Sequence, residues 1–111
     1  MSRFTGKNVF ITGAGSGFGQ RTAELFAEEG ASYVYLVDRI QERLDATAER
    51  VTAAGAVPVS ICTDLSSMTN CRDAIAHALA TNPKLDVMIS NAAAWADDHF
   101  FDISDESWRH I

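Results

Sequence analysis

Short apolar segments alternate with longer amphipathic segments along this chain, and no other feature of the sequence limits its fold as strongly. The apolar segments are rich in β-branched residues, which is typical of strands covered on both faces. They occupy residues 8–12, 32–38, 57–61 and 85–90. Segments with apolar residues at helical spacing follow the first three, over residues 20–30, 40–55 and 68–80. This order predicts an α/β fold in which right-handed crossovers join parallel strands.

The apolar spacing also predicts which face of each helix packs on the sheet. In the first helix this face comprises Phe18, Thr22, Leu25 and Phe26. In the second it comprises Ile40, Leu44, Ala48 and Val51, and in the third Met68, Cys71, Ile75, Ala78 and Leu79. Pro58 predicts an edge position for the third strand, because proline cannot donate a ladder hydrogen bond. Residues 104–111 are typical of the start of a further helix, with Ser104 as its cap.

The first strand runs directly into the sequence TGAGSGFG, residues 12–19. A tight turn from strand to helix points backbone N–H groups at the space above the helix N-terminus, where the helix dipole favours anions. Glycine removes the Cβ atom that would keep a phosphate away from this backbone. The turn therefore predicts a phosphate-binding loop, and turn geometry alone is the alternative.

The spacing of the four glycines argues against two common phosphate-binding loops. They stand at positions 13, 15, 17 and 19, which fits G-x-G-x-x-G in no register. No two of them have the spacing of the Walker loop, and neither Lys7 nor Lys84 stands where that loop needs its lysine, which disfavours a nucleoside-triphosphate hydrolase. The pattern that remains is T-G-x-x-x-G-x-G, formed by Thr12, Gly13, Gly17 and Gly19.

This pattern resembles the short-chain dehydrogenase/reductase family, and the likeness extends along the chain. The resemblance implies a Rossmann-type, doubly wound parallel sheet with strand order 3-2-1-4, of which residues 1–111 form the N-terminal half. It also implies a nicotinamide dinucleotide cofactor and hydride transfer between that cofactor and an alcohol or carbonyl substrate. Residues 101–108 look like the family's stretch that leads into its next helix.

Polar residues that come after the strands match further family positions. Asp38 matches the residue that reads the adenosine ribose, and Asp64-Leu65 matches the pair beside the adenine. Asn91-Ala92-Ala93 matches the family's N-A-G, with alanine replacing glycine at position 93. All lie where parallel strands end, which is the edge at which open α/β sheets bind ligands. The expected cofactor-binding residues are Thr12, Gly13, Ser16, Gly17, Phe18, Gly19, Asp38, Arg39, Asp64, Leu65, Asn91, Ala92 and Ala93.

Each of these polar residues also has an alternative role that needs no ligand. Asp38 could cap a helix or lie in a solvated turn, and Asp64 could cap the third helix. Asn91 could satisfy turn backbone. As a ribose-binding residue, Asp38 favours NAD over NADP, because its carboxylate can accept both ribose hydroxyls and would repel a 2′-phosphate. Arg39 could instead receive a 2′-phosphate or lie solvated, and Ser16 adds no basic group to the loop.

The catalytic groups of the family are expected to lie beyond these residues. In the family a tyrosine is the general acid/base, and a lysine four residues later lowers its pKa, which otherwise lies near 10. Neither Tyr33 nor Tyr35 has a lysine at that spacing. We therefore expect no catalytic residue here and interpret the chain as a fragment that ends inside a helix. The alternative is a genuine short product that binds a nucleotide or a partner without catalysis.

Composition narrows the range of partners. The net charge is −6 and the arginines are scattered, which argues against nucleic acid. No apolar stretch has the length of a membrane helix, and the histidines and cysteines form no metal-binding pattern. We expect a cytoplasmic protein. The resemblance implies that its full-length form is a homo-oligomer, because the family's usual oligomer contacts involve the helix that begins at residue 104 and the next one.

Overall fold

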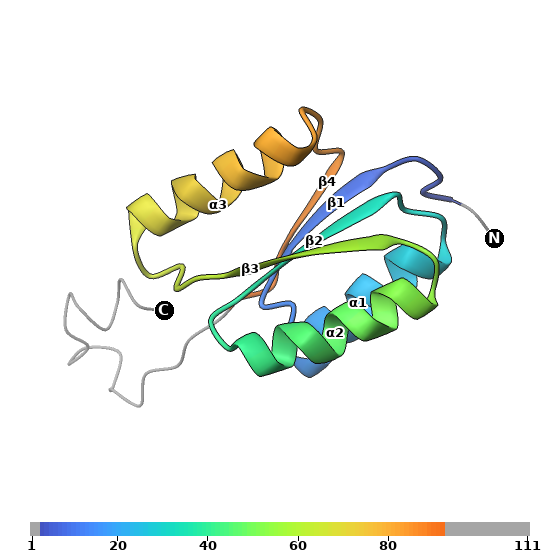
Figure 1. Cartoon of the computed structure of the whole chain (residues 1–111), viewed down its shortest axis with the longest axis horizontal. Helices are drawn as coiled ribbons and strands as arrows, with labels where there is room; N and C mark the ends of the chain where they lie inside the picture. Colours follow the sequence, from blue (N-terminus) through green and yellow to red (C-terminus); the bar gives the residue numbers. More distant parts are fainter. Residues whose placement is uncertain (1–2, 93–111) are drawn as a thin grey trace, which may run out of the picture.

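The computed structural model of the chain describes residues 3–92, in which strands and helices alternate (Figure 1). The strands are β1 (Asn8–Thr12), β2 (Tyr33–Asp38), β3 (Val57–Cys62) and β4 (Val87–Ser90). The helices are α1 (Gly17–Glu28), α2 (Gln41–Ala53) and α3 (Met68–Thr81). The predicted order of elements is confirmed, and the predicted bounds differ by at most a few residues. The further helix predicted at residues 104–111 lies outside the described residues.

The strands form one parallel sheet in the order β3-β2-β1-β4, as predicted. Helices α1 and α2 cover one face of this sheet and α3 covers the other (Figure 1). This two-sided cover is the doubly wound arrangement, in which the chain changes direction after β3. The edge position that Pro58 predicted for β3 is also confirmed.

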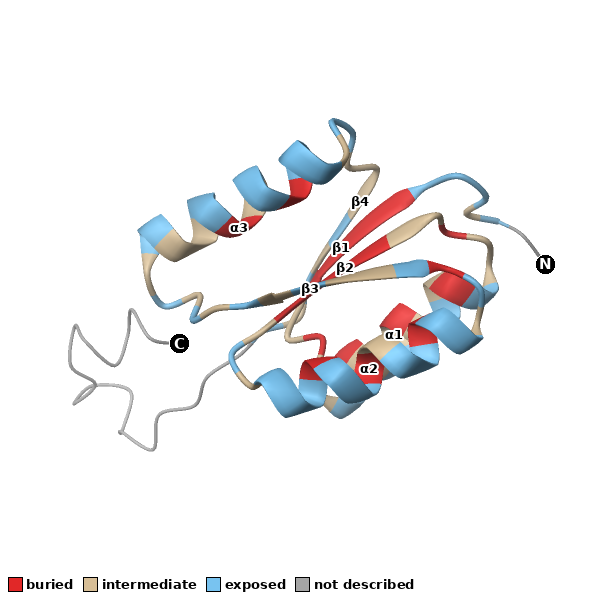
Figure 2. Cartoon of the chain, viewed as in Figure 1, coloured by how far each residue is buried: buried red, intermediate tan, exposed pale blue. Residues whose placement is uncertain are grey.

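Side chains that alternate along the two central strands fill two hydrophobic layers, one on each face of the sheet. Val9, Ile11, Val34 and Leu36 pack under α1 and α2. Phe10, Tyr35 and Val37 point to the opposite face and pack with Ala74 and Ala78 of α3. Figure 2 shows buried residues along β1 and β2 and on the sides of the helices that face the sheet.

The predicted packing face of α1 is only partly right: Phe26 is partly buried and packs against the core, but Phe18 and Leu25 do not. Phe18 is 85% exposed and Leu25 is 43% exposed, whereas the buried residues of the helix are Gly19, Ala23 and Ala27. A Cβ atom on Gly19 would lie only 2.0 Å from the carbonyl oxygen of Gly13. Because this contact brings α1 so close to the sheet, small side chains occupy its inward face and the larger ones are displaced outward.

The other two helices differ in this respect. In α3 the small residues Ala74 and Ala78 are buried, whereas Met68 and Leu79, which were predicted to pack, are exposed. In α2 the prediction is confirmed for Leu44 and Val51, which are fully buried. A polar residue, Thr47, completes the buried face of α2.

A polar contact joins the beginnings of β1 and β4. The backbone N–H of Asn8 donates to Asp86 Oδ2 at 2.9 Å, and the N–H of Asp86 donates to the Asn8 carbonyl at 2.9 Å. The buried Asn8 side chain also donates to the Lys84 carbonyl at 2.9 Å. The bond from Asn8 and the neighbouring Lys84 ammonium lower the pKa of Asp86 below its usual value. This contact anchors β4 at the edge of the described sheet.

Candidate nucleotide-binding site

The glycine loop joins the carboxyl end of β1 to the N-terminus of α1, and three of its four glycines are required by the protein itself. Gly13 has a φ of +66°, and a Cβ there would lie 3.0 Å from the Ala92 backbone. A Cβ on Gly15 would lie 2.5 Å from the Cβ of Arg43. A Cβ on Gly19 would meet the Gly13 carbonyl. These glycines therefore permit close packing around the turn.

Gly17 differs from the other three glycines. Apart from its two chain neighbours and the backbone of its own helix, no atom of the described residues lies within 4 Å of the position that its Cβ would occupy. Ser16 caps α1, and its Oγ accepts a hydrogen bond from the Gly19 N–H at 3.1 Å. Among residues 3–92, no acceptor engages the N–H groups of Gly17 and Phe18. The N-terminus of α1 thus directs free donors toward open space, an arrangement that suits an anion.

Three hydrogen bonds attach the loop to the β2–α2 unit. The N–H of Ala14 donates to the Val37 carbonyl at 3.0 Å. The N–H of Gly15 donates to Asp38 Oδ2 at 2.9 Å. The Thr47 hydroxyl donates to the Ala14 carbonyl at 2.9 Å. Sequence reasoning missed Thr47, although a threonine among the apolar positions of an amphipathic helix is a signal that could have found it.

Asp38 lies at the end of β2, as predicted, and its carboxylate also accepts hydrogen bonds from turn backbone, a role that needs no ligand. Its Oδ1 accepts from the N–H of Ile40 at 3.0 Å, in the turn that leads into α2. Its Oδ2 is the atom that holds Gly15, so the carboxylate lies against the glycine loop. Each oxygen can accept a further hydrogen bond. Arg39, the next residue, is exposed.

The end of β4 is bound to the same loop. The Asn91 side-chain amide donates to the Gly13 carbonyl at 3.2 Å and to Ser16 Oγ at 3.1 Å. The Thr12 hydroxyl accepts from the N–H groups of Asn91 at 3.0 Å and Ala92 at 3.1 Å. Asn91 therefore lies at the glycine loop, and it also has its alternative role, because its side chain supports the backbone of the turn. Ala93 lies outside the described residues.

Asp64 and Leu65 come after β3, two strands away from β1 in the sheet. Asp64 Oδ1 accepts from the N–H of Ser66 at 2.9 Å. The N-cap of α3 is Ser67, whose hydroxyl accepts from the Asn70 N–H, so the alternative in which Asp64 caps this helix is wrong. Leu65 is half-buried and packs on the α3 side of the sheet.

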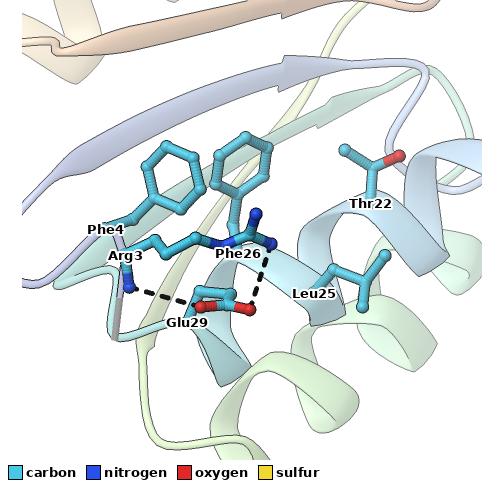
Figure 3. Close-up of a pocket in the computed structure, with 6 residues that line it drawn as sticks. All are labelled: Arg3, Phe4, Thr22, Leu25, Phe26 and Glu29. Atoms are coloured by element: carbon cyan, nitrogen blue, oxygen red, sulfur yellow. Dashed lines mark hydrogen bonds and ion pairs between the residues drawn. The ribbon is translucent and has the colours of Figure 1, made fainter. Parts of the chain in front are cut away.

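A surface hollow of about 210 Å³ lies elsewhere, beside the C-terminal half of α1 (Figure 3). The rings of Phe4 and Phe26 meet edge to face in its wall, with centroids 4.7 Å apart. Arg3 donates to both carboxylate oxygens of Glu29 at 3.2 Å, which lowers the pKa of Glu29. The hollow contains none of the predicted site residues. It is therefore separate from the glycine loop at the other end of α1.

Neither a metal centre nor a membrane span is found within residues 3–92. No group of three or more histidine, cysteine, aspartate or glutamate residues in that range is arranged to hold a metal ion. None of the described helices combines the length and the apolar character needed to cross a membrane.

The fold is the doubly wound α/β architecture that is typical of nucleotide-binding proteins. The sequence matches the family described as short chain dehydrogenase over residues 7–111, so the chain belongs to this family. One curated relative is an uncharacterized oxidoreductase of Methylorubrum extorquens, which is 29% identical over the whole chain. The match spans 100% of this chain but 45% of that relative, so the chain has less than half the length of the protein it matches.

Solved structures of the family share the fold. L-sorbose reductase from Gluconobacter frateurii, solved with NADPH and L-sorbose, is 27% identical and superposes with a TM-score of 0.88. That match covers 99% of this chain and 42% of the reductase. NAD⁺-bound xylitol dehydrogenase is 29% identical with a TM-score of 0.79, over 83% of this chain and 35% of the enzyme. The chain is thus part of an oxidoreductase family whose members bind nicotinamide dinucleotides.

Proposed function

We propose that this chain is the cofactor-binding half of an NAD-dependent oxidoreductase. The observation that carries the proposal is the open space at Gly17, beside N–H groups of Gly17 and Phe18 that no described acceptor engages, in a loop that the carboxylate of Asp38 holds at Gly15. A glycine needed for the backbone alone has either protein atoms near its missing Cβ, as Gly15 and Gly19 do, or a positive φ, as Gly13 does, and Gly17 has neither. Gly17 is explained by a ligand that approaches its backbone.

The residues present fit a dinucleotide. The N–H groups of Gly17 and Phe18 would receive the pyrophosphate, and the Asp38 carboxylate would accept the adenosine ribose hydroxyls. Asp64-Leu65 would border the adenine. Asn91 and Ala92 would lie beside the cofactor between the pyrophosphate and the nicotinamide. When bound, the cofactor would supply or accept the hydride, while this chain's own residues bind and orient it.

We propose NAD rather than NADP on the basis of Asp38. Among the solved relatives, xylitol dehydrogenase binds NAD⁺ and L-sorbose reductase binds NADPH, so family membership leaves both cofactors open. The carboxylate of Asp38 already accepts two N–H groups and carries negative charge at the loop. A 2′-phosphate beside it would be repelled at short range. To favour NADP, Arg39 would have to bind the 2′-phosphate strongly enough to outweigh this repulsion, and its side chain is exposed to solvent.

We further propose that the whole enzyme transfers a hydride between nicotinamide and an alcohol or carbonyl carbon. The tyrosine and lysine that the resemblance implies, together with a serine that polarises the carbonyl, would then lie after Ile111. The full-length protein would then be a homo-oligomer. Cys62 and Cys71 are both unpaired, which fits a reducing compartment and supports a cytoplasmic location. The alternative is a short product that binds nucleotide without catalysis, and the codons after Ile111 distinguish the two. A downstream serine and then Y-x-x-x-K support the enzyme, and a stop codon supports the alternative.

Isothermal titration calorimetry of the chain with NAD, NADP and ADP-ribose tests the binding proposal. We expect NAD and ADP-ribose to bind and NADP to bind more weakly. We expect no reduction of NAD when alcohols are added, because no catalytic tyrosine–lysine pair is present. A folded chain that binds none of the three ligands would refute the nucleotide site. Tighter binding of NADP than of NAD would refute the assignment to Asp38.

A further inference from the structure

We infer that Thr47 is a positioning residue for the glycine loop, an inference that rests on the proposed nucleotide-binding function. Thr47 lies in α2, far along the chain from the loop, and its side chain is fully buried. Its hydroxyl donates to the carbonyl oxygen of Ala14 at 2.9 Å. Through this bond a helix that contributes no predicted ligand contact determines where the loop lies.

The hydroxyl proton has two acceptors within reach, and the assignment between them depends on their other bonds. Thr47 Oγ1 lies 2.9 Å from the Ala14 carbonyl and 3.1 Å from the Arg43 carbonyl of its own helix. The Arg43 carbonyl stands four residues before Thr47 and receives the ordinary helical bond from its N–H. Within residues 3–92, Ala14 O has Thr47 as its hydrogen-bond donor. The proton is therefore placed on the bond to Ala14.

The same hydroxyl also accepts a hydrogen bond from the first helix. The side-chain amide of Gln20 in α1 donates to Thr47 Oγ1 at 3.3 Å. Thr47 thus connects α1, α2 and the loop at one buried atom. A buried hydroxyl with a donor on one side and an acceptor on the other holds a defined orientation.

The consequence for the site depends on the order of residues in the loop. Ala14 is held at its N–H by Val37 and at its carbonyl by Thr47. Gly15, the next residue, is held by Asp38. Gly17, whose open space would admit the pyrophosphate, comes two residues later. Thr47 is therefore expected to keep the free N–H groups of the α1 N-terminus aimed at the ligand before it binds, which is preorganisation.

Four variants of the chain separate this role from a general effect on stability. Thr47→Val replaces the hydroxyl with a methyl of similar size, and Thr47→Ser retains the hydroxyl. Val51→Ala weakens the buried face of the same helix one turn further on, without removing a polar contact. Thr52→Val makes the same change, threonine to valine, at an exposed position of that helix.

Two measurements are made on each variant: NAD affinity by calorimetry well below the melting temperature, and amide hydrogen exchange without ligand. We expect Thr47→Val to weaken NAD binding about tenfold, the effect of about 1.4 kcal/mol. We expect it also to speed exchange of the Gly15 amide relative to that of Ile11 in β1. Thr47→Ser should restore both values to within about twofold of the wild type, or about 0.4 kcal/mol. Val51→Ala should lower the melting temperature without either effect, and Thr52→Val should change neither.

The two measurements distinguish failure of the proposed function from failure of the inference about Thr47. If wild-type chain binds no NAD, the proposed function is refuted, and the exchange of Gly15 still decides whether Thr47 holds the loop. If Thr47→Val leaves both NAD affinity and Gly15 exchange unchanged, the inference is wrong. It is also wrong if Val51→Ala weakens NAD binding as much as Thr47→Val does, because Thr47 would then act only through the stability of the fold.

Discussion

The Oδ2 atom of Asp38 lies 2.9 Å from the amide nitrogen of Gly15, so the acid that ends β2 is hydrogen-bonded to the glycine loop that comes after β1. A side chain at position 15 is excluded, because its Cβ would lie 2.8 Å from that same carboxylate oxygen. The glycine and the acid are therefore one unit: the glycine lets the carboxylate approach, and the carboxylate fixes the loop. A substitution at either residue should therefore alter binding at both the pyrophosphate and the ribose positions.

Replacing Asp38 with alanine should change both the strength and the selectivity of cofactor binding. We expect NAD to bind about tenfold more weakly, because a charged acceptor for the ribose hydroxyls is lost. NADP should lose much less affinity, because repulsion of its 2′-phosphate disappears together with the carboxylate. The ratio of the two dissociation constants, measured by calorimetry, is the decisive quantity. Asp45→Ala, at an exposed position of α2, is the control and should leave the ratio unchanged.

Substituting alanine at Gly17 and at Gly19 should separate binding from folding. Gly19→Ala should lower the free energy of unfolding by about 1–3 kcal/mol or more, because its Cβ would overlap the Gly13 carbonyl. Gly17→Ala should change the free energy of unfolding by less than about 1 kcal/mol, since its Cβ meets no described atom and alanine favours helix. It should nevertheless weaken NAD binding, because the Cβ occupies the proposed pyrophosphate space. Urea unfolding and calorimetry provide the two measurements. Equal loss of stability in both variants would show that the space at Gly17 is not open.

The features that sequence reasoning predicted correctly depend on local spacing and on chain topology. Alternating segments determine the parallel sheet, and the strand order places Asp38 and Asn91 at the same edge as the glycine loop. The odd-numbered glycines identified the loop class without any coordinates. These signals are contained in short stretches of sequence and in the handedness of the crossovers.

The features that were missed depend on contacts between residues far apart in the chain. Thr47 and Ala14 are separated by 33 positions, and Asp86 and Asn8 by 78. Neither pair has a spacing that a motif could encode. The exposure of Phe18 was missed for a related reason: apolar periodicity suggests an inward face, but the close contact of Gly19 with Gly13 decides which face fits against the sheet. Packing distance overrode the hydrophobic pattern there.

Tyr35→Phe should stabilise the protein. The Tyr35 side chain is fully buried, and its hydroxyl has no hydrogen-bond partner among residues 3–92. Because a buried unsatisfied hydroxyl is unfavourable, its removal should raise the free energy of unfolding by about 1 kcal/mol in urea titrations at neutral pH. Tyr33→Phe is the control, since the Tyr33 ring stacks on Tyr35 but is only half-buried. A Tyr35→Phe protein that is less stable than wild type would show that the hydroxyl has a partner.

The same substitution should alter the alkaline limb of the stability curve. Burial raises the pKa of Tyr35, with a smaller contribution from the charge of Tyr33. As pH rises past about 10, the usual tyrosine pKa, the unfolded chain loses this proton before the folded chain does, and the wild type loses stability. Tyr35→Phe removes this contribution, so its stability should fall less between neutral pH and about pH 10.5. A difference between the two proteins that stays constant across this range would contradict the assignment.

The acid limb should report on the contact between Asp86 and Asn8. The backbone N–H of Asn8 and the ammonium of Lys84 lower the pKa of Asp86 in the folded chain. The resulting stability is fully present well above the usual aspartate pKa of about 3.9 and is lost progressively as pH falls through it toward the lowered folded value, because the unfolded chain binds the proton first. The advantage of the wild type over Asp86→Asn should therefore be constant above about pH 5.5 and shrink below it. Glu29, whose pKa Arg3 lowers, titrates in both proteins and cancels in this comparison. Asp73→Asn, at an exposed position of α3, should show no such dependence, and an equal acid response in both variants would remove Asp86 as its source.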